Sequence, residues 1–249
     1  RWIYWCQSPA FNGTEGGIGD YGPNQAYMGG MAMGGSNNQS GGAGVVIVGG
    51  RNNSTYYNAS DAALLGGQNN YAGGQNSIAL GGYRLTNDTN ASYSTILNGY
   101  YSQTKGIRGY TVFNNGQMPF ATGSSTKTLS NIGAFELGAV TTDATTTRLR
   151  SDSSAASQYN QLALWADEAI ACRITIVAHV SSGDSKAWTS DLVIHRQGTG
   201  SAAIVGTPAA PTVIGATAGA SSWSVAFAAD TTYNTLAVNV TGVAATTIR

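Results

Sequence analysis

The most regular feature of the sequence is a short apolar triplet followed by a pair of small or polar residues, usually Gly-Gly. The last residues of successive triplets lie 15, 17, 15, 17 and 16 positions apart. The six copies are Met31–Met33, Val46–Val48, Ala63–Leu65, Ile78–Leu80, Thr95–Leu97 and, more weakly, Thr111–Phe113. Apolar triplets predict short strands, and Gly or Asn pairs permit the positive φ of a tight corner.

The repeat predicts a solenoid, because one such unit alone buries almost no apolar surface. Stacked units form a ladder whose layers are roughly 4.8 Å apart. Within a triplet the first and third residues point one way and the middle residue points the other way. Both sets are apolar here, so a second apolar surface is needed outside the solenoid. Another copy of the same chain would supply that surface.

Two copies of the repeat carry a family resemblance. Residues 76–82 read Asn-Ser-Ile-Ala-Leu-Gly-Gly, and residues 93–99 read Tyr-Ser-Thr-Ile-Leu-Asn-Gly. They resemble the head repeats of trimeric autotransporter adhesins, and similar repeats occur in bacteriophage tail fibres and tailspikes. The resemblance covers residues 28–116 and implies a left-handed parallel β-roll, three copies of which pack around a threefold axis. The alternating spacing of 15 and 17 residues departs from the adhesin pattern.

The second half of the chain changes to a period of two. Between Ile170 and Val180 every even position is apolar, which predicts a strand with one buried face. Further strands are expected at Trp188–His195, around Trp223–Phe227 and around Leu236–Val240. Several such strands with polar turns favour an antiparallel β-sandwich. The spacing in residues 158–171 fits either a strand or a short helix.

This half resembles a C-terminal domain of phage tail fibre and virion structural proteins. The landmarks are residues 141–149, the strand 170–180, Trp223–Val225 with Ala229–Thr232, and Val240–Gly242 with Thr247–Arg249. In that family a Trp usually follows, so we expect truncation at the C-terminus. The expected organisation is a connecting segment over 1–27, a β-roll over 28–116 and a β-sandwich over 117–249, in an all-β chain.

The composition argues against two classes of function, nucleic-acid binding and membrane insertion. Only 10% of the residues are charged, and the formal net charge is zero. The chain therefore lacks the basic excess of nucleic-acid-binding proteins, and no apolar run is long enough to insert into a membrane. The two cysteines, Cys6 and Cys172, are expected to be unpaired.

Motifs for catalysis or metal binding are absent, so no catalytic residue, metal site or cofactor is predicted. His179 and His195 are expected on strand faces directed to solvent or to a subunit contact; their alternative is a pair that binds an ion near a threefold axis. Asp61 and Asp88 lie in different repeats. A polysaccharide depolymerase requires two carboxylates close together. These two would approach each other only through stacking of the repeats.

The tyrosine-rich segments between the triplets are the best functional clue. Tyr, Asn, Ser and Gly together form neutral, adaptable contact surfaces. The candidates for receptor or glycan binding are Tyr56, Tyr57, Tyr83, Tyr100, Tyr101, Arg51 and Arg84. The alternative is that these tyrosines pack between layers or between subunits.

The sequence thus predicts a homotrimeric structural protein of a virion, with tail or neck proteins as partners. It would be a phage tail fibre or fibre-like appendage that faces outward and attaches to a host-surface glycan. Three alternatives stay open: a purely architectural neck or head fibre, a bacterial trimeric adhesin passenger, and a depolymerase tailspike.

Overall fold

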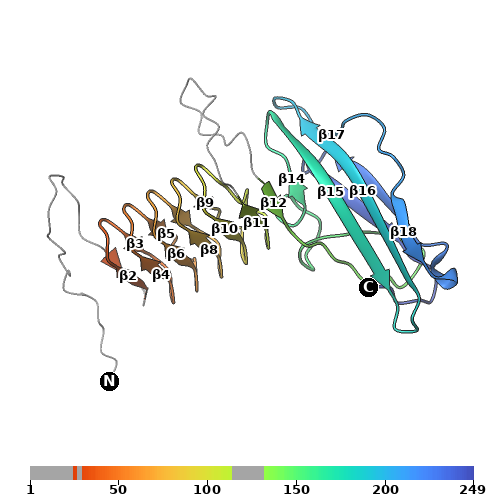
Figure 1. Ribbon diagram of the computed structural model, residues 1–249, viewed down its shortest axis with the longest axis horizontal. Helices are drawn as coiled ribbons and strands as arrows, with labels where there is room; N and C mark the ends of the chain where they lie inside the picture. Colours follow the sequence, from red (N-terminus) through yellow and green to blue (C-terminus); the bar gives the residue numbers. More distant parts are fainter. Residues whose placement is uncertain (1–24, 27–29, 114–131) are drawn as a thin grey trace. The chain divides into compact units, whose positions relative to one another are not determined.

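The computed structural model describes residues 25–26, 30–113 and 132–249 (Figure 1). The chain divides into two compact units, Arg1–Phe135 and Glu136–Arg249. The predicted domain limits after residues 27 and 116 fall outside the described residues, as does Cys6. The first unit is a β-solenoid and the second is built from two antiparallel sheets, so the all-β prediction is confirmed.

All six apolar triplets are strands of one parallel sheet, stacked in chain order. Each triplet pairs in register with the next, so that Met33, Val48 and Leu65 lie one above another, as the repeat predicts. The strands are β2 (Met31–Met33), β4 (Val46–Val48), β6 (Ala63–Leu65), β8 (Ile78–Leu80), β10 (Thr95–Leu97) and β11 (Thr111–Phe113).

A second parallel ladder forms another side of the solenoid, with one short strand per turn. Its strands are β1 (Gln25–Ala26), β3 (Gln39–Ser40), β5 (Ser54–Thr55), β7 (Tyr71–Ala72) and β9 (Thr86–Asn87). The loops that return from this ladder to the next triplet explain the alternating spacing. Loops 41–45 and 73–77 are two residues shorter than loops 56–62 and 88–94.

The interior of the solenoid is narrow and contains one aliphatic side chain from the middle of each triplet. Ile47, Leu64 and Ile96 are completely buried, and Ala79 is nearly so. The middle position of the triplet therefore faces inward, which the alternation alone did not decide. The small Ala79 in one layer shows that the cross-section of the interior is filled differently from turn to turn.

A column of buried asparagines accompanies the aliphatic side chains. The side-chain N–H groups of Asn53 donate to the carbonyl oxygens of Gly49 at 3.3 Å, Gly66 at 3.3 Å and Gly67 at 3.2 Å. The Asn53 Oδ1 atom accepts the backbone N–H of Asn70 at 3.0 Å. Each amide thus holds the glycine corners of two turns together, and at Gly67 it shares the carbonyl oxygen with the backbone N–H of Arg51.

The same arrangement repeats above and below. Asn38 bonds glycine carbonyls of its own and the following turn and accepts the N–H of Asn53, and Asn70 accepts the N–H of Leu85 at 2.9 Å. All three asparagines are buried. Leu85 takes the corresponding position in the next layer and ends the column with an aliphatic side chain.

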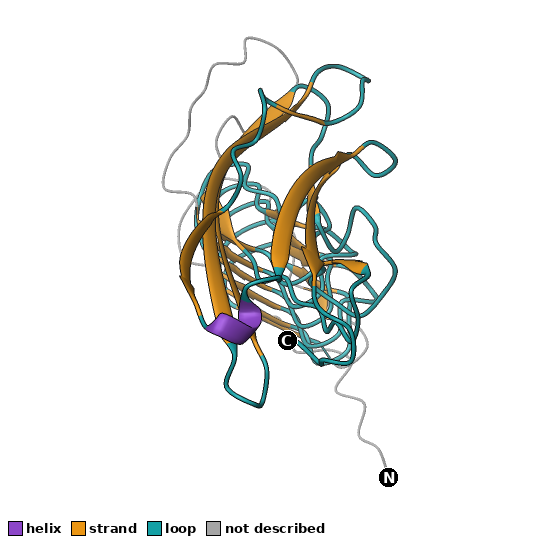
Figure 2. Ribbon diagram, turned by 90° about the vertical axis from the view of Figure 1, so that its right-hand side faces the viewer, coloured by secondary structure: helices purple, strands orange, loops and turns teal. Residues whose placement is uncertain are grey.

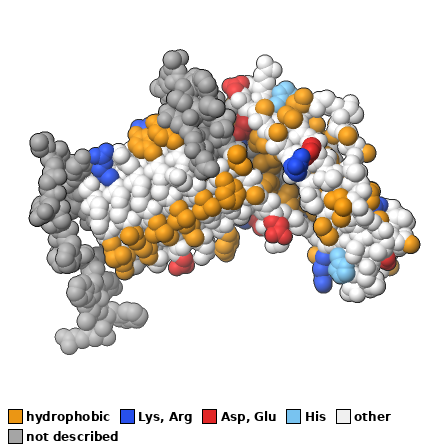
Figure 3. Space-filling model, in the orientation of Figure 1, with side chains coloured by type: hydrophobic (Ala, Val, Ile, Leu, Met, Phe, Trp, Pro, Cys, Tyr) orange, Lys and Arg blue, Asp and Glu red, His pale blue; other side chains and the backbone are white. Residues whose placement is uncertain are grey.

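The outer face of the triplet sheet carries an exposed band of apolar side chains, which we call the apolar ridge. Met33, Leu65 and Phe113 keep 47%, 44% and 42% of their surface exposed. The band follows the solenoid from layer to layer (Figure 3). Its members are the first and third apolar residues of the triplets: Met31, Met33, Val46, Val48, Ala63, Leu65, Ile78, Leu80, Leu97 and Phe113.

The parallel stacking stops at β12 (Ile132–Ala134), which pairs antiparallel with β11. The ring of Tyr110 lies edge-on to Phe135, 5.7 Å between centroids, and Gly133 leaves room for the Tyr110 ring where a Cβ would collide with it. The sequence did not predict this strand, because Ile132-Gly133-Ala134 lacks the Gly-Gly corner of the repeat.

The second unit contains two four-stranded sheets, drawn as curved strands in Figure 2. One sheet contains β15 (Glu168–His179), β16 (Ser185–Arg196), β17 (Ala203–Ile204) and β18 (Thr212–Ala216). The other contains β13 (Thr146–Arg148), β14 (Leu162–Ala163), β19 (Ser224–Asp230) and β20 (Thr235–Thr241). These strands confirm the expected antiparallel sandwich.

The long hairpin β15–β16 follows the predicted alternation. Ile176 and Val180 are buried on the even face, while Arg173, Thr175 and Val177 on the odd face are exposed. The ambiguous segment 158–171 contains strand β14 and the start of β15, so the strand reading is confirmed. Among the described residues the only helical turn is the 3₁₀ turn η1 (Ala218–Ala220).

Candidate functional site

The corners that follow the Gly-Gly pairs align candidate side chains from successive turns in two columns. The first column consists of residues that form single parallel bridges from turn to turn: Ser36, Arg51, Gln68, Tyr83 and Tyr100. The second column contains the residue after each of these, always with positive φ: Asn37, Asn52, Asn69, Arg84 and Tyr101. Neither column contains a carboxylate.

Four of the predicted site residues meet at the last two corners, and we call them the aromatic–arginine cluster: Tyr83, Arg84, Tyr100 and Tyr101. The rings of Tyr83 and Tyr100 are stacked, with centroids 4.9 Å apart and planes at 22°. Tyr101 is edge-on to Tyr100 at 4.6 Å and to Tyr83 at 6.0 Å. Offset and edge-to-face arrangements of this kind are favourable between aromatic rings.

The Arg84 guanidinium lies against two of these rings. Its Cζ atom is 5.4 Å from the centroid of Tyr83 and 5.1 Å from that of Tyr101, which is within the range of a cation–π interaction. Its Nη1 atom donates a hydrogen bond to the Tyr101 hydroxyl at 2.6 Å. Partial desolvation, followed by the neighbouring Tyr101, raises the pKa of Tyr100.

Tyr56 and Tyr57 lie elsewhere, at the start of the long return loop 56–62. Their rings are 4.2 Å apart and tilted by 45°, and the hydrogen bond between the two hydroxyls raises the pKa of Tyr56. Tyr57 is exposed. The predicted aromatic surface is therefore divided between a corner and a return loop. Arg51 stands in the corner column two turns before Tyr83.

The remaining candidates for chemistry do not converge. His179 pairs with Ser185 at one end of the β15–β16 hairpin, and His195 pairs with Ala169 at the other end. Within one chain the two histidines are thus separated by the length of the hairpin. Among the described residues, no group of three or more His, Cys, Asp and Glu side chains could hold a metal ion.

The two acidic residues considered for a depolymerase occupy different points of their loops. Asp88 begins the loop 88–94, whereas Asp61 lies near the end of the loop 56–62. Burial raises the pKa of Asp88, and its backbone N–H donates to the Thr104 hydroxyl at 3.1 Å. No hydrogen bond between the Asp61 and Asp88 side chains is present in this part of the chain.

Cys172 is a half-buried free thiol on the even face of β15. Burial raises its pKa to about 11, because a thiolate is poorly solvated there. The thiol is therefore protonated at neutral pH.

Sequence inspection missed that Arg84 and Tyr101 share one backbone position with Asn37, Asn52 and Asn69. The available signal was the distance from the glycine pair, since each of the five residues follows its pair by two positions. Aligning the repeats on the pair would have found it.

None of the helices among the described residues is long and apolar enough to cross a membrane. No known protein family, curated protein or solved structure matches this chain.

Proposed function

We propose that the chain is a structural protein of a bacteriophage virion. In this proposal it is a homotrimeric tail fibre, or a similar appendage, that faces outward and attaches to a glycan of the host surface. Other tail or neck proteins would hold it on the virion, and it would act without catalysis or a cofactor. The β-solenoid architecture is compatible with fibre and adhesin proteins.

The single observation that carries the proposal is the apolar ridge. It presents side chains such as Met33 and Leu65 to water in every layer, although half-exposed aliphatic rows are costly on a free surface. The ridge holds no charged residue and repeats with the layers, so it matches a second ridge of the same kind. A threefold arrangement buries all three ridges around one axis and leaves the aromatic–arginine clusters to the outside of each chain.

Three copies also suit attachment. Weak binding by one cluster becomes strong binding by the assembly when the sites are linked at a fixed distance, because the second and third contacts are intramolecular. A fibre of this type needs neither a deep pocket nor a catalytic group.

The test is the native mass of the purified chain, measured by light scattering and compared on heated and unheated denaturing gels. We expect a mass of three chains that resists detergent until it is heated. Leu65→Asp places a charge on the ridge and should give monomers, whereas Asn58→Asp adds the same charge to an exposed loop and should leave the trimer intact. A monomeric native chain, or a trimer unaffected by Leu65→Asp, would contradict the proposal.

Binding to a panel of bacterial cells then separates the alternatives. The attachment proposal expects trimer-dependent binding to some cells, which Leu65→Asp abolishes. A trimer that binds none of them would indicate a purely architectural fibre. Release of reducing sugar, lost in Asp61→Asn or Asp88→Asn, would indicate a depolymerase.

A further inference from the structure

Along the second corner column the residue type changes although the backbone conformation stays the same. From Asn52 onward each residue of this column donates its backbone N–H to the turn before it, and the φ angles of all five lie between 54° and 59°. Asn occupies the first three positions, Asn37, Asn52 and Asn69. Arg84 and Tyr101 occupy the last two.

Asn is the residue that the backbone favours here. Its short polar side chain tolerates the left-handed conformation, whereas a long or aromatic side chain is more strained in it. Arg84 and Tyr101 therefore carry a local cost that three earlier turns avoid. Strain at a bulky residue commonly marks a functional position, because folding alone would select the tolerant residue.

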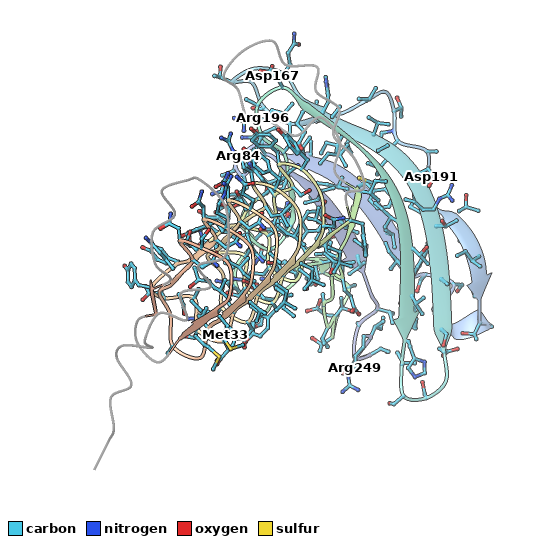
Figure 4. All side chains as sticks on the ribbon, turned by 60° about the vertical axis from the view of Figure 1, so that its left-hand side comes forward. Met33, Arg84, Asp167, Asp191, Arg196 and Arg249 are labelled. Carbon is cyan, nitrogen blue, oxygen red and sulfur yellow. The ribbon has the colours of Figure 1, made fainter. Side chains whose placement is uncertain are left out.

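The two strained residues are adjacent in space and complete one cluster. From neighbouring turns they place a guanidinium and a phenol beside the stacked rings of Tyr83 and Tyr100. Figure 4 shows Arg84 on the edge of the solenoid opposite Met33 of the apolar ridge. A ligand at the cluster is therefore compatible with a trimer built on the ridge.

The Arg84 guanidinium is available to bind an anionic ligand. Arg84 is exposed, and its guanidinium is hydrogen-bonded to Tyr101 and lies against the rings of Tyr83 and Tyr101. Within residues 30–113 and 132–249 it forms no ion pair with a carboxylate. A guanidinium has five N–H donors arranged to bind an anionic group through two parallel hydrogen bonds.

We infer that the aromatic–arginine cluster binds an anionic saccharide. Arg84 would pair with the acidic group, the tyrosine rings would pack against the C–H face of the sugar, and the phenols would exchange hydrogen bonds with its hydroxyls. Successive turns repeat at roughly 4.8 Å, so the corner columns would follow an extended chain rather than a single sugar. This inference names the ligand of the proposed attachment function and rests on it.

The experiment measures binding of the intact protein to an array of carboxylated, sulfated and neutral saccharides. Quantitative titrations follow with oligogalacturonate, dextran sulfate and dextran at physiological salt. We expect binding to one or both anionic classes and none to dextran, and the two anionic probes identify the acidic group. Binding to neutral sugars alone, or to no anionic saccharide, would overturn the inference.

Two substitutions separate binding from folding. Arg84→Asn and Tyr101→Asn each introduce the residue of the first three turns, so they should leave the melting temperature unchanged or raise it. Both should weaken anionic saccharide binding by about tenfold or more, the equivalent of losing one charge-assisted contact. Arg173→Gln removes the same charge from the exposed face of β15, in the second unit, and should leave binding within about twofold.

Loss of stability in Arg84→Asn together with unchanged saccharide binding would overturn the inference and identify the cluster as a clasp between turns. The native mass of each variant is read beside its affinity. If the wild-type chain is monomeric but binds the anionic saccharide through Arg84, the fibre proposal fails and the site stands. If it is a trimer on which Arg84→Asn has no effect on saccharide binding, the site fails and the fibre proposal stands.

Discussion

The solenoid buries short rows of aliphatic side chains, such as Ile47 and Leu64, and over three turns one asparagine amide per layer. The sandwich instead buries large side chains among its strands: Trp188, Ile194, Trp223 and Leu236. In the solenoid almost every contact is made with the next turn, less than twenty residues away. In the sandwich, β13 pairs with β20 and joins residues almost a hundred positions apart. The same β-structure is therefore stabilised by local repetition in one unit and by long-range packing in the other.

This difference predicts that the two units respond differently to destabilising substitutions. A repeat array loses stability turn by turn, because each unit contacts only its neighbours. A single packed core responds as a whole, because its side chains share one interior. Substitutions in each unit test this contrast.

The largest effect is expected from Trp188→Ala in β16. Trp188 is 4% exposed, and the buried Lys186 ammonium lies 5.2 Å from its ring centroid while donating to the carbonyl oxygens of Ser221 and Trp223. Removing a buried tryptophan costs about 3–5 kcal/mol. Hydrogen exchange should therefore accelerate throughout 168–241 and remain unchanged in 31–113.

Trp165→Ala is the matched control, since Trp165 is 38% exposed. It should shift the unfolding midpoint little. Acceleration confined to the strands that touch Trp188 would contradict the view that the sandwich unfolds as one unit.

The next effect distinguishes the two glycines of a corner. Both Gly49 and Gly50 have positive φ, but a Cβ on Gly49 meets nothing within 4 Å, whereas one on Gly50 would collide with the Gly67 carbonyl and the Asn53 amide. Gly49→Ala should cost about 1 kcal/mol for the conformation alone. Gly50→Ala should cost about 3 kcal/mol, because overpacking is added.

Denaturant unfolding of the solenoid measures both glycine variants. Equal costs would show that the corner requires glycine only for its φ angle. A larger cost for Gly50→Ala would show that the second glycine is required because the next turn approaches it closely.

The repeat could be predicted because its chemistry is local. The triplets and the glycine corners specify the strand, the turn and the register within one repeat. The alternation of apolar and polar residues in 170–180 likewise specifies which face of β15 is buried. The position of each tyrosine relative to the others could not be predicted in the same way. Tyr56 and Tyr83 occupy similar polar segments, but a return loop holds one and a corner holds the other.

The amide column and strand β12 escaped prediction for a related reason. An asparagine after a glycine pair reads as a turn residue, and only the stacked structure shows that Asn53 points inward to the carbonyls of two turns. Ile132–Ala134 has no repeat signature, and its antiparallel pairing with β11 depends on a partner in the preceding turn.

The third effect, smaller than that of Gly50→Ala, tests whether the solenoid depends on its polar interior. Asn53→Ala removes the hydrogen bonds to Gly49, Gly66 and Gly67 and leaves the buried N–H of Asn70 without its acceptor. Unsatisfied buried groups cost about 1–3 kcal/mol, so we expect a loss of about 2 kcal/mol in denaturant unfolding. Hydrogen exchange should accelerate only in the turns on either side of Asn53.

Asn58→Ala, in an exposed part of the return loop, is the control and should have little effect. Exchange that accelerates along the whole of 31–113 would show that the solenoid unfolds as one body, like the sandwich. Acceleration limited to adjacent turns would show that each amide stabilises only its own pair of corners. In that case the turns that contain Asn38, Asn53 and Asn70 could tolerate substitution of the outer columns without losing their register, because the amides inside set that register independently of the side chains outside.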